Sequence, residues 1–291
     1  MSASAGSLRS DRPRGRWVGR LFYGFLLFSL VLGFATLGAL LVQVFLEGYK
    51  WVDLVLFLEP PSADPLIAGA EPAILATIFL GVLLILFTVP LGVGTAIYLE
   101  EYADRERWYN RLLEVNIQNL AAVPSIVYGI LGLAFLVRGI GLGRVLLAGA
   151  MILTLLVLPT VIIAAREAIR AVPDSIRQGA YALGATKWQV VWRQVLPAAT
   201  PGIATGSILA TSRGLGETAP LLLVGALTYV SFNPTLLGEF TALPVQIYQW
   251  VSRPQEEFRT LAAAAIIVLL GILLTLNATA IWIRNRYERR W

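Results

Sequence analysis

Six long apolar segments alternate with polar loops along the chain. They lie near residues 21–46, 72–99, 116–137, 145–165, 201–226 and 260–283. A helix needs about 20 mainly apolar residues to cross a bilayer, and each segment reaches that length. The first is too long for a signal-peptide core and has no clear cleavage motif, so we expect an uncleaved span. The pattern predicts an all-α membrane protein with six transmembrane helices and both termini on one side.

Basic residues indicate which side that is, because Lys and Arg accumulate in cytoplasmic loops. They are frequent in the N-terminal tail, in the loops 100–115 and 166–200, and at the C-terminus. The opposite loops hold only Lys50, Arg138, Arg144, Arg253 and Arg259. We therefore expect both termini to be cytoplasmic, with residues 1–20 as a basic tail and residues 21–291 as one polytopic transmembrane domain. The loop 227–259 is then external, and its aromatic and proline residues predict short helices at the membrane surface.

The amino-acid composition excludes several kinds of catalytic and binding site. Hydrophobic residues make up 57% and charged residues 14% of the chain, against roughly 25% charged in soluble domains. The absence of His and Cys excludes zinc sites of the usual ligand types and thiol or imidazole catalysis. Neither lysine, Lys50 or Lys187, follows a glycine, so a phosphate-binding loop for ATP is excluded. We expect no enzymatic activity, metal or cofactor, and we attribute the net charge of +5 to topology rather than to nucleic-acid binding.

The loop 166–200 contains "VPDSIRQGAYALGATKWQVVWRQVLP", which is too polar to span and too regular for a linker. Asp174 or Ser175 can cap a helix that ends at Gly184, and Thr186 can cap a second helix that stops before Pro197. Apolar positions share one face of each helix: Ile176, Ala180 and Leu183 on the first, and Trp188, Val191, Trp192 and Val195 on the second. Either the helices rest on lipid headgroups or their corner inserts into a cytoplasmic partner.

Four segments carry a resemblance to a known family. The segment "ALGATKWQVVWRQVLP" resembles the EAA loop of ABC-importer permeases. "NLAAVPSIVYGILGLAF", "RGLGETAPLLLVGA" and "LPVQIYQWVSRPQEEF" are similar to segments of the permeases of phosphate importers. The similarity runs from about residue 70 to the C-terminus. The chain is thereby identified as resembling the type I ABC importer permeases.

The resemblance implies a permease subunit of an ATP-driven, binding-protein-dependent phosphate importer in the bacterial cytoplasmic membrane. It implies three partners: a sister permease, an ATPase dimer and an external phosphate-binding protein. It also implies that the corner between the two short helices docks into a groove of the ATPase, through Gln178, Gly179, Ala180, Leu183, Gly184, Ala185 and Thr186. Gln178 stands where many importers have the glutamate that names the loop, and Gly179 replaces the first alanine.

The fifth apolar segment contains an ionisable pair, Arg213 and Glu217. On a helix these two residues share a stripe about 80° wide with Gly202, Gly206 and Ala210. Small residues at this spacing let helices approach closely, so we expect the stripe to face another helix or a cavity. Each charge costs about 2.5 to 3.5 kcal/mol on insertion scales, which favours a functional role over a salt bridge that only fixes helix register.

We therefore interpret Arg213, Glu217 and the adjacent Thr218 as candidates for the substrate pathway, with the guanidinium as a station for an anion. Two functional alternatives stay open. The substrate is another oxyanion, such as sulfate, molybdate or phosphonate, or the chain is a passive anion channel. Two further expectations concern packing: Pro124 kinks the third span, and the acidic loop that contains Glu100, Glu101 and Glu114 forms a solvated surface.

Overall fold

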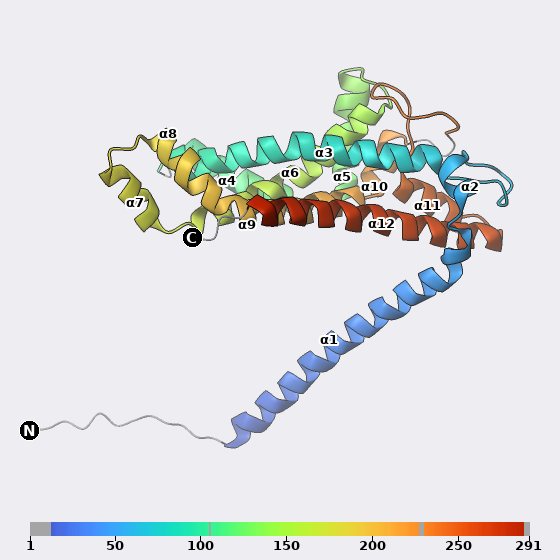
Figure 1. Ribbon diagram of the computed structural model, residues 1–291, viewed down its shortest axis with the longest axis horizontal. Helices are drawn as coiled ribbons and strands as arrows, with labels where there is room; N and C mark the ends of the chain where they lie inside the picture. The colour runs from blue at the N-terminus through green and yellow to red at the C-terminus, as the bar shows by residue number, and fades with distance from the viewer. Residues whose placement is uncertain (1–12, 105, 227–229, 288–291) are drawn as a thin grey trace, which may run out of the picture. The chain divides into compact units, whose positions relative to one another are not determined.

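The structure is a computed structural model that describes residues 13–104, 106–226 and 230–287. All regular secondary structure in these described residues is helical, which confirms the all-α prediction (Figure 1). The chain divides into two compact units, residues 1–47 and 48–291.

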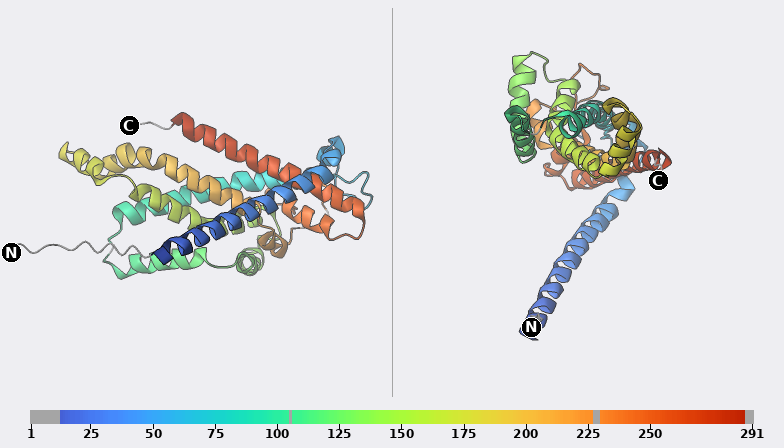
Figure 2. Two further views of the ribbon diagram at one scale, coloured as in Figure 1. Left: turned by 90° about the horizontal axis from the view of Figure 1, so that it is seen from below. Right: turned by 90° about the vertical axis from the view of Figure 1, so that its left-hand side faces the viewer.

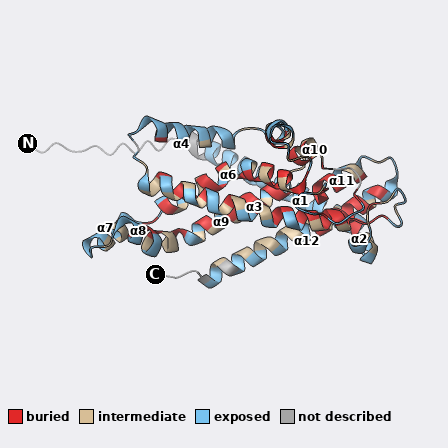
Figure 3. Ribbon diagram, turned by 90° about the horizontal axis from the view of Figure 1, so that it is seen from above, coloured by how far each residue is buried: buried red, intermediate tan, exposed pale blue. Residues whose placement is uncertain are grey.

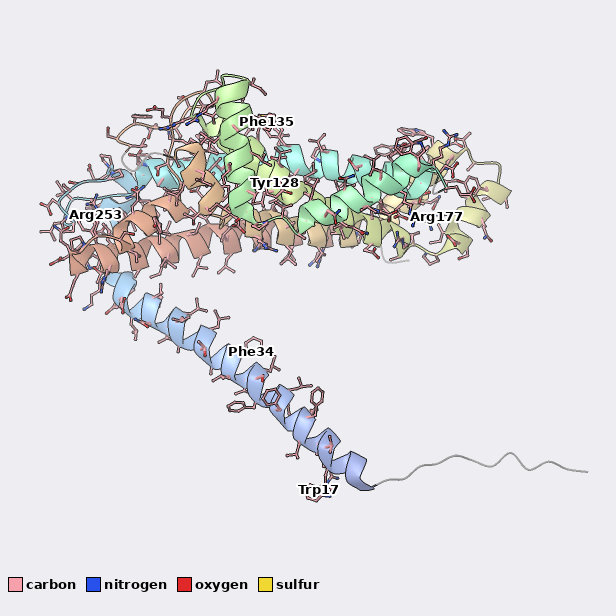
Figure 4. The ribbon with its side chains drawn as sticks, turned by 180° about the vertical axis from the view of Figure 1, so that it is seen from behind. Trp17, Phe34, Tyr128, Phe135, Arg177 and Arg253 are labelled. Carbon is pink, nitrogen blue, oxygen red and sulfur yellow. The ribbon has the colours of Figure 1, made fainter. Side chains whose placement is uncertain are left out.

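The described residues of the first unit, 13–47, belong to one long helix, α1 (Pro13–Gly48). Its apolar side chains are exposed on every side, as Figure 4 shows for Trp17 and Phe34. A helix that is apolar all round requires lipid or another protein around it. Residues 1–12 of the predicted basic tail lie outside the described residues, and residues 13–20 of that tail belong to the helix.

The second unit is a bundle built from four long helices (Figures 1 and 2). They are α3 (Glu71–Ile97), α6 (Leu146–Arg170), α9 (Leu196–Leu215) and α12 (Glu256–Tyr287). Helix α6 packs against both α3 and α9 and carries much of the core, including Leu153, Val157 and Val161. Figure 3 shows the buried positions gathered along these inner helix faces.

Shorter elements connect and cover the bundle. They are η1 (Tyr49–Trp51), α2 (Leu54–Leu58), the π-helical turn η2 (Tyr98–Tyr102), α4 (Trp108–Ala121), α5 (Ser125–Gly132), the π-helical segment η3 (Leu133–Gly139), α7 (Asp174–Ala182), α8 (Lys187–Val190), the π-helical turn η4 (Val191–Val195), α10 (Ala219–Val224) and α11 (Leu243–Val251). Helix α7 lies at one end of the bundle and α11 at the other (Figure 1). We call these the α7 end and the α11 end.

The third apolar segment is broken rather than kinked. Helix α4 ends at Ala121, α5 begins at Ser125, and the axes differ by 106°. Pro124 explains the break, because its ring disfavours helical geometry at the preceding residue, Val123, and removes an amide donor. The expectation of one helix with a packing kink over 116–137 is therefore wrong.

Pro197, unlike Pro124, does not interrupt a helix. The expected stop before Pro197 is wrong, because α8, η4 and α9 follow one another without interruption from Lys187 to Leu215. The wider turn η4 ends at Val195, two residues before Pro197, and includes Arg193, whose carbonyl would meet the proline ring in a regular helix. One continuous helical segment therefore joins the polar loop to the interior of the bundle.

Helix α11 is packed within the protein at the α11 end. Leu243 and Trp250 are fully buried, and the helix lies against α12 and α3. The amide of Leu243 donates to Thr77 Oγ1 on α3 at 2.8 Å. The short helix expected in the loop 227–259 is thus present, with Trp250 buried against neighbouring helices and Tyr248 exposed; its place at a membrane surface stays a prediction. Residues 227–229 of the loop lie outside the described part.

Four helical segments of the described chain are long and apolar enough to cross a membrane, or five if the bent pair α4–α5 counts as one. They correspond to the first, second, fourth and sixth apolar segments. The fifth segment differs from the single helix expected over 201–226, because α9 ends at Leu215 and α10 starts only at Ala219.

The small-residue stripe of α9 faces α6, as expected. A Cβ atom added to Gly206 would lie 2.4 Å from Ala164 Cβ, and one added to Gly202 would lie 2.8 Å from Ala168 Cβ. Gly206→Leu is therefore expected to lower the stability of the chain by about 1 to 3 kcal/mol through overpacking. Thermal unfolding in detergent measures this. Gly271→Leu on α12, where nothing lies within 4 Å, is the control, and equal midpoints for the two variants would contradict the prediction.

Candidate functional site

The break between α9 and α10 determines where Arg213 and Glu217 lie. Helix α9 closes with tight turns in which Gly216 N–H donates to Arg213 O at 3.1 Å and Glu217 N–H donates to Gly214 O at 3.2 Å. Gly216, Glu217 and Thr218 then separate the two helices. Arg213 is thus in the last helical turn, while Glu217 is in the break itself rather than on the expected helix.

The pair is loose. Arg213 Nε lies 3.9 Å from Glu217 Oε1, and the two side chains are 81% and 24% exposed. In the described part of the chain no hydrogen bond engages the Arg213 guanidinium. Arg213 therefore does not pack with Gly202 and Gly206 against α6, and its donors are available to another group.

A pocket of about 240 Å³ lies beside the pair. One wall of the pocket is the α4–α5 joint, residues 120–125. A second wall is formed by α6 and a third by the end of α9 and the break after it. The residues of these two walls are Leu156, Val157 and Thr160, and Ala210, Arg213, Gly214 and Glu217. One cation and one carboxylate thus meet walls that carry no other charged side chain. Thr218 is not among the lining residues and instead precedes α10, where its carbonyl accepts from Leu222 N–H at 3.0 Å.

Tyr128, which the sequence did not single out, holds the joint in place. Its hydroxyl donates to Leu120 O across the break at 2.8 Å. Figure 4 shows Tyr128 near the end of α5 that meets α4. A Cβ atom added to the next residue, Gly129, would lie 2.8 Å from Pro220 Cα on α10. The two broken segments, α4–α5 and α9–α10, therefore meet beside the pocket.

The corner at the α7 end has the expected construction. Gly184 adopts a φ of +79°, and Ala185 N–H donates to Ala180 O at 3.1 Å while Gly184 N–H donates to Tyr181 O at 2.9 Å. This is the glycine-dependent helix end known as a Schellman motif. Thr186 then caps α8 in a reciprocal capping box with Gln189. At the start of α7, Asp174 and Ser175 are not the cap; Pro173 holds that position.

The predicted coupling residues divide into two groups. Gln178, Gly179, Leu183, Gly184 and Thr186 are exposed, while Ala180 and Ala185 pack against the bundle. Leu183 does not share the buried face of Ile176 and Ala180, because its position in the C-terminal cap turns it outward to 90% exposure. Leu183 is therefore an exposed apolar side chain at the corner.

On the following helical segment, the expected apolar face is half buried. Val191 and Val195 are fully buried, while Trp188 and Trp192 are exposed and lie 5.1 Å apart between ring centroids. The two indoles add to the apolar surface beside the corner.

The acidic loop is solvated at Asp104 and Glu106, as expected, but not at its first two carboxylates. The Glu100 and Glu101 side chains on η2 are only 4% and 7% exposed, and both pair with arginines. Their partners come from α6 and α7, more than 60 residues away in the chain. In the sequence, Glu100 and Glu101 simply follow an apolar segment, and nothing near them indicates which distant arginines they pair with. No cluster of candidate metal ligands occurs in the described residues.

Comparisons with known proteins agree with this architecture. Residues 88–290 match the family model described as "Binding-protein-dependent transport system inner membrane component". The chain is 33% identical to the phosphate transport system permease protein PstA 1 of Mycobacterium tuberculosis, over 76% of this chain and 72% of the relative. It is also 33% identical to PstA of Yersinia pestis, over 87% of this chain and 85% of the relative.

A solved structure is similar in fold. The structure of a bacterial alginate ABC transporter in complex with an alginate pentasaccharide-bound periplasmic protein contains a chain that matches with a TM-score of 0.68 and 17% identity, over 95% of this chain and 98% of that chain. The matched family model covers more than half of the sequence and includes the broken helices, the pocket and the α7 corner. The chain belongs to the family of binding-protein-dependent transport system inner membrane components.

Proposed function

We propose that this chain is the permease subunit of an ATP-driven importer of inorganic phosphate in the bacterial inner membrane. The observation that carries the proposal is the 33% identity to PstA permeases, in one case over 87% of the chain. The partners are a sister permease, an ATPase dimer and an external phosphate-binding protein. The alginate transporter, whose structure is a complex with a periplasmic protein, supports a binding-protein partner by its similar fold.

The orientation follows from the basic residues. The α7 end carries Arg166, Arg170, Arg177 and Lys187, so it faces the cytoplasm together with both termini. The α11 end then faces the binding protein. The bent pair α4–α5 and the broken pair α9–α10 serve as the third and fifth of six spans. Helical breaks at membrane depth are tolerated where they line a cavity, and the pocket provides one.

Arg213 serves as the anion station on the substrate pathway. A planar guanidinium can donate two parallel hydrogen bonds to a phosphate, and the Arg213 donors are not engaged elsewhere in the described chain. Glu217 holds the Arg213 guanidinium near the pocket, with Glu217 Oε1 at 3.9 Å from Arg213 Nε. Its negative charge also weakens capture of an anion, as release requires, since a permeation site must let its substrate leave. Thr218, beside the pocket lining, adds no contact of its own in this state.

The corner of α7 and α8 receives the ATPase. The exposed set Gln178, Gly179, Leu183, Gly184 and Thr186 provides a projecting surface without a charged side chain. Leu183 is the apolar knob at its tip. The permease itself hydrolyses no ATP, and the ATPase supplies the energy for switching the pathway between its two open states.

Reconstitution into vesicles tests the function. The chain is combined with the sister permease, the ATPase and the binding protein, and uptake of labelled phosphate is measured with and without ATP. We expect uptake that requires ATP and is not displaced by sulfate, molybdate or phosphonate. Uptake without ATP would indicate a passive channel, and equal displacement by another oxyanion would assign that substrate instead.

A further inference from the structure

Buried ion pairs connect α7 to the main bundle. Arg177 Nη2 on α7 lies 3.0 Å from Glu101 Oε1, and Arg177 also donates to the carbonyls of Val172 at 2.5 Å and Ile169 at 2.9 Å. Figure 4 shows Arg177 at the α7 end and Arg253 at the opposite end. The guanidinium therefore binds both the end of α6 and the turn η2 that follows α3. A displacement of α7 must move these contacts.

Arg166 of α6 continues the connection from η2 to α4. Its Nε lies 2.8 Å from Glu100 Oε1, and its Nη2 lies 2.6 Å from Glu114 Oε1. The Arg166 and Glu100 side chains are 8% and 4% exposed, so water screens this pair little, whereas Glu114 is 40% exposed and more accessible to water. Glu100 also accepts from Arg170 at 2.7 Å. A guanidinium can hold two carboxylates from different elements because its donors form a rigid planar fork.

Helix α4 has few other attachments. Among its described residues only Asn110 is buried, and Asn110 is anchored near the start of the helix through Asp104 O at 2.9 Å and the Tyr98 hydroxyl at 3.2 Å. Glu114 provides the next polar anchor. Beyond it the helix runs to Leu120 and Ala121, which line the pocket that contains Arg213. The position of this pocket wall therefore depends on the Glu114–Arg166 contact, together with the hydrogen bond from the Tyr128 hydroxyl to Leu120 O at the joint.

We propose that Arg166 is a positioning residue that transmits movement of α7 to the α4 wall of the Arg213 pocket, through Glu100 and Glu101 on one side and Glu114 on the other. The inference rests on the proposed function, because it presumes that an ATPase moves α7. The physical link from α7 to Glu114 is direct contact between side chains, apart from the backbone step from Glu100 to Glu101, and helix α4 itself carries the link from Glu114 to the pocket wall. Such networks couple distant sites when the elements they join have two discrete arrangements.

The test compares Glu114→Ala with a matched control, Glu167→Ala, in the reconstituted complex. Glu167 also pairs with an arginine, Arg170 at 3.3 Å, but within one helix and on the surface. The readout is phosphate transported per ATP hydrolysed, which a purely structural role would not change in correctly assembled complexes. We expect Glu114→Ala to lower this ratio at least about 5-fold, the lower range of ordinary coupling energies, and Glu167→Ala to leave it unchanged.

A second readout does not require phosphate transport. The chain has no cysteine, so Ser125→Cys introduces a single thiol into the pocket wall. We expect ATP to change its rate of labelling in the otherwise unaltered complex, and Glu114→Ala to abolish that change. If Glu114→Ala fails to accumulate in the membrane, Glu114→Gln, which keeps an acceptor but removes the charge, takes its place.

The outcomes separate the two proposals. Failure of the unaltered complex to transport phosphate would overturn the proposed function, and the labelling readout would still test the coupling path. Phosphate transport by the unaltered complex together with a normal transport ratio and a normal labelling response in Glu114→Ala would overturn the role of Arg166.

Discussion

Arg213→Ala is expected to reduce ATP-driven phosphate uptake at least about 100-fold while leaving the amount of protein in the membrane unchanged. Two charge-assisted hydrogen bonds contribute about 1.5 to 3 kcal/mol each, and each 1.4 kcal/mol is a factor of ten. The fold does not depend on the side chain, which is 81% exposed and held only at 3.9 Å from Glu217. Uptake of labelled phosphate, normalised to membrane abundance, provides the measurement.

Two variants act as controls for this result. Arg213→Lys keeps the charge but lacks the planar fork, so we expect partial uptake. Arg284→Ala removes an arginine of the same bundle that donates to Thr205 Oγ1 at 2.6 Å and does not line the pocket, so we expect uptake near that of the parent. Parent-level uptake by Arg213→Ala would exclude the guanidinium from the pathway.

Gly184→Trp is expected to leave the chain inserted in the membrane but to abolish both co-purification with the ATPase and ATP-driven uptake. Nothing of its own chain lies within 4 Å of a Cβ at this position, so the indole meets no internal obstacle. The φ of +79° adds about 1 to 2 kcal/mol of local strain for an L-residue. A bulky group at the corner therefore acts mainly on whatever docks there.

Gly141→Trp is the matched control for that substitution. Gly141 has the same φ of +79° and likewise nothing within 4 Å, but it lies in the turn between η3 and α6 rather than at the α7 corner. Gly184→Asn is a second control, because asparagine tolerates the left-handed conformation with a small side chain. We expect ATPase binding to survive in both controls. Survival of ATPase binding and uptake in Gly184→Trp would show that the corner is not the docking surface.

Sequence reasoning was reliable where one helical turn or one apolar stretch contains the physical cause. The left-handed glycine at position 184 and the Thr186 cap follow from steric and hydrogen-bonding rules that act over a few residues. The stripe of Gly202 and Gly206 follows from helical periodicity in the same way. The role of the charged pair in transport and the role of the corner in docking stay predictions.

Proline showed the limit of such local rules. Pro124 ends a helix, whereas Pro197 is accommodated within a continuous one, although both follow an apolar or aromatic segment. The difference lies in the turn before each residue, since the wider turn η4 precedes Pro197 and a non-helical residue precedes Pro124. Local composition did not distinguish these two geometries.

The sequence by itself determined that this is a helical membrane protein, where its main apolar helices lie and where the polar loop turns, because hydrophobic length and backbone sterics are local properties. Only the tertiary structure decided that Glu100 and Glu101 are buried, that α4 is tied to α6, and that Arg213 meets the α4–α5 joint at a pocket. The ion pairs among these contacts join residues 52 to 76 positions apart, and their free energy exists only after the helices have packed.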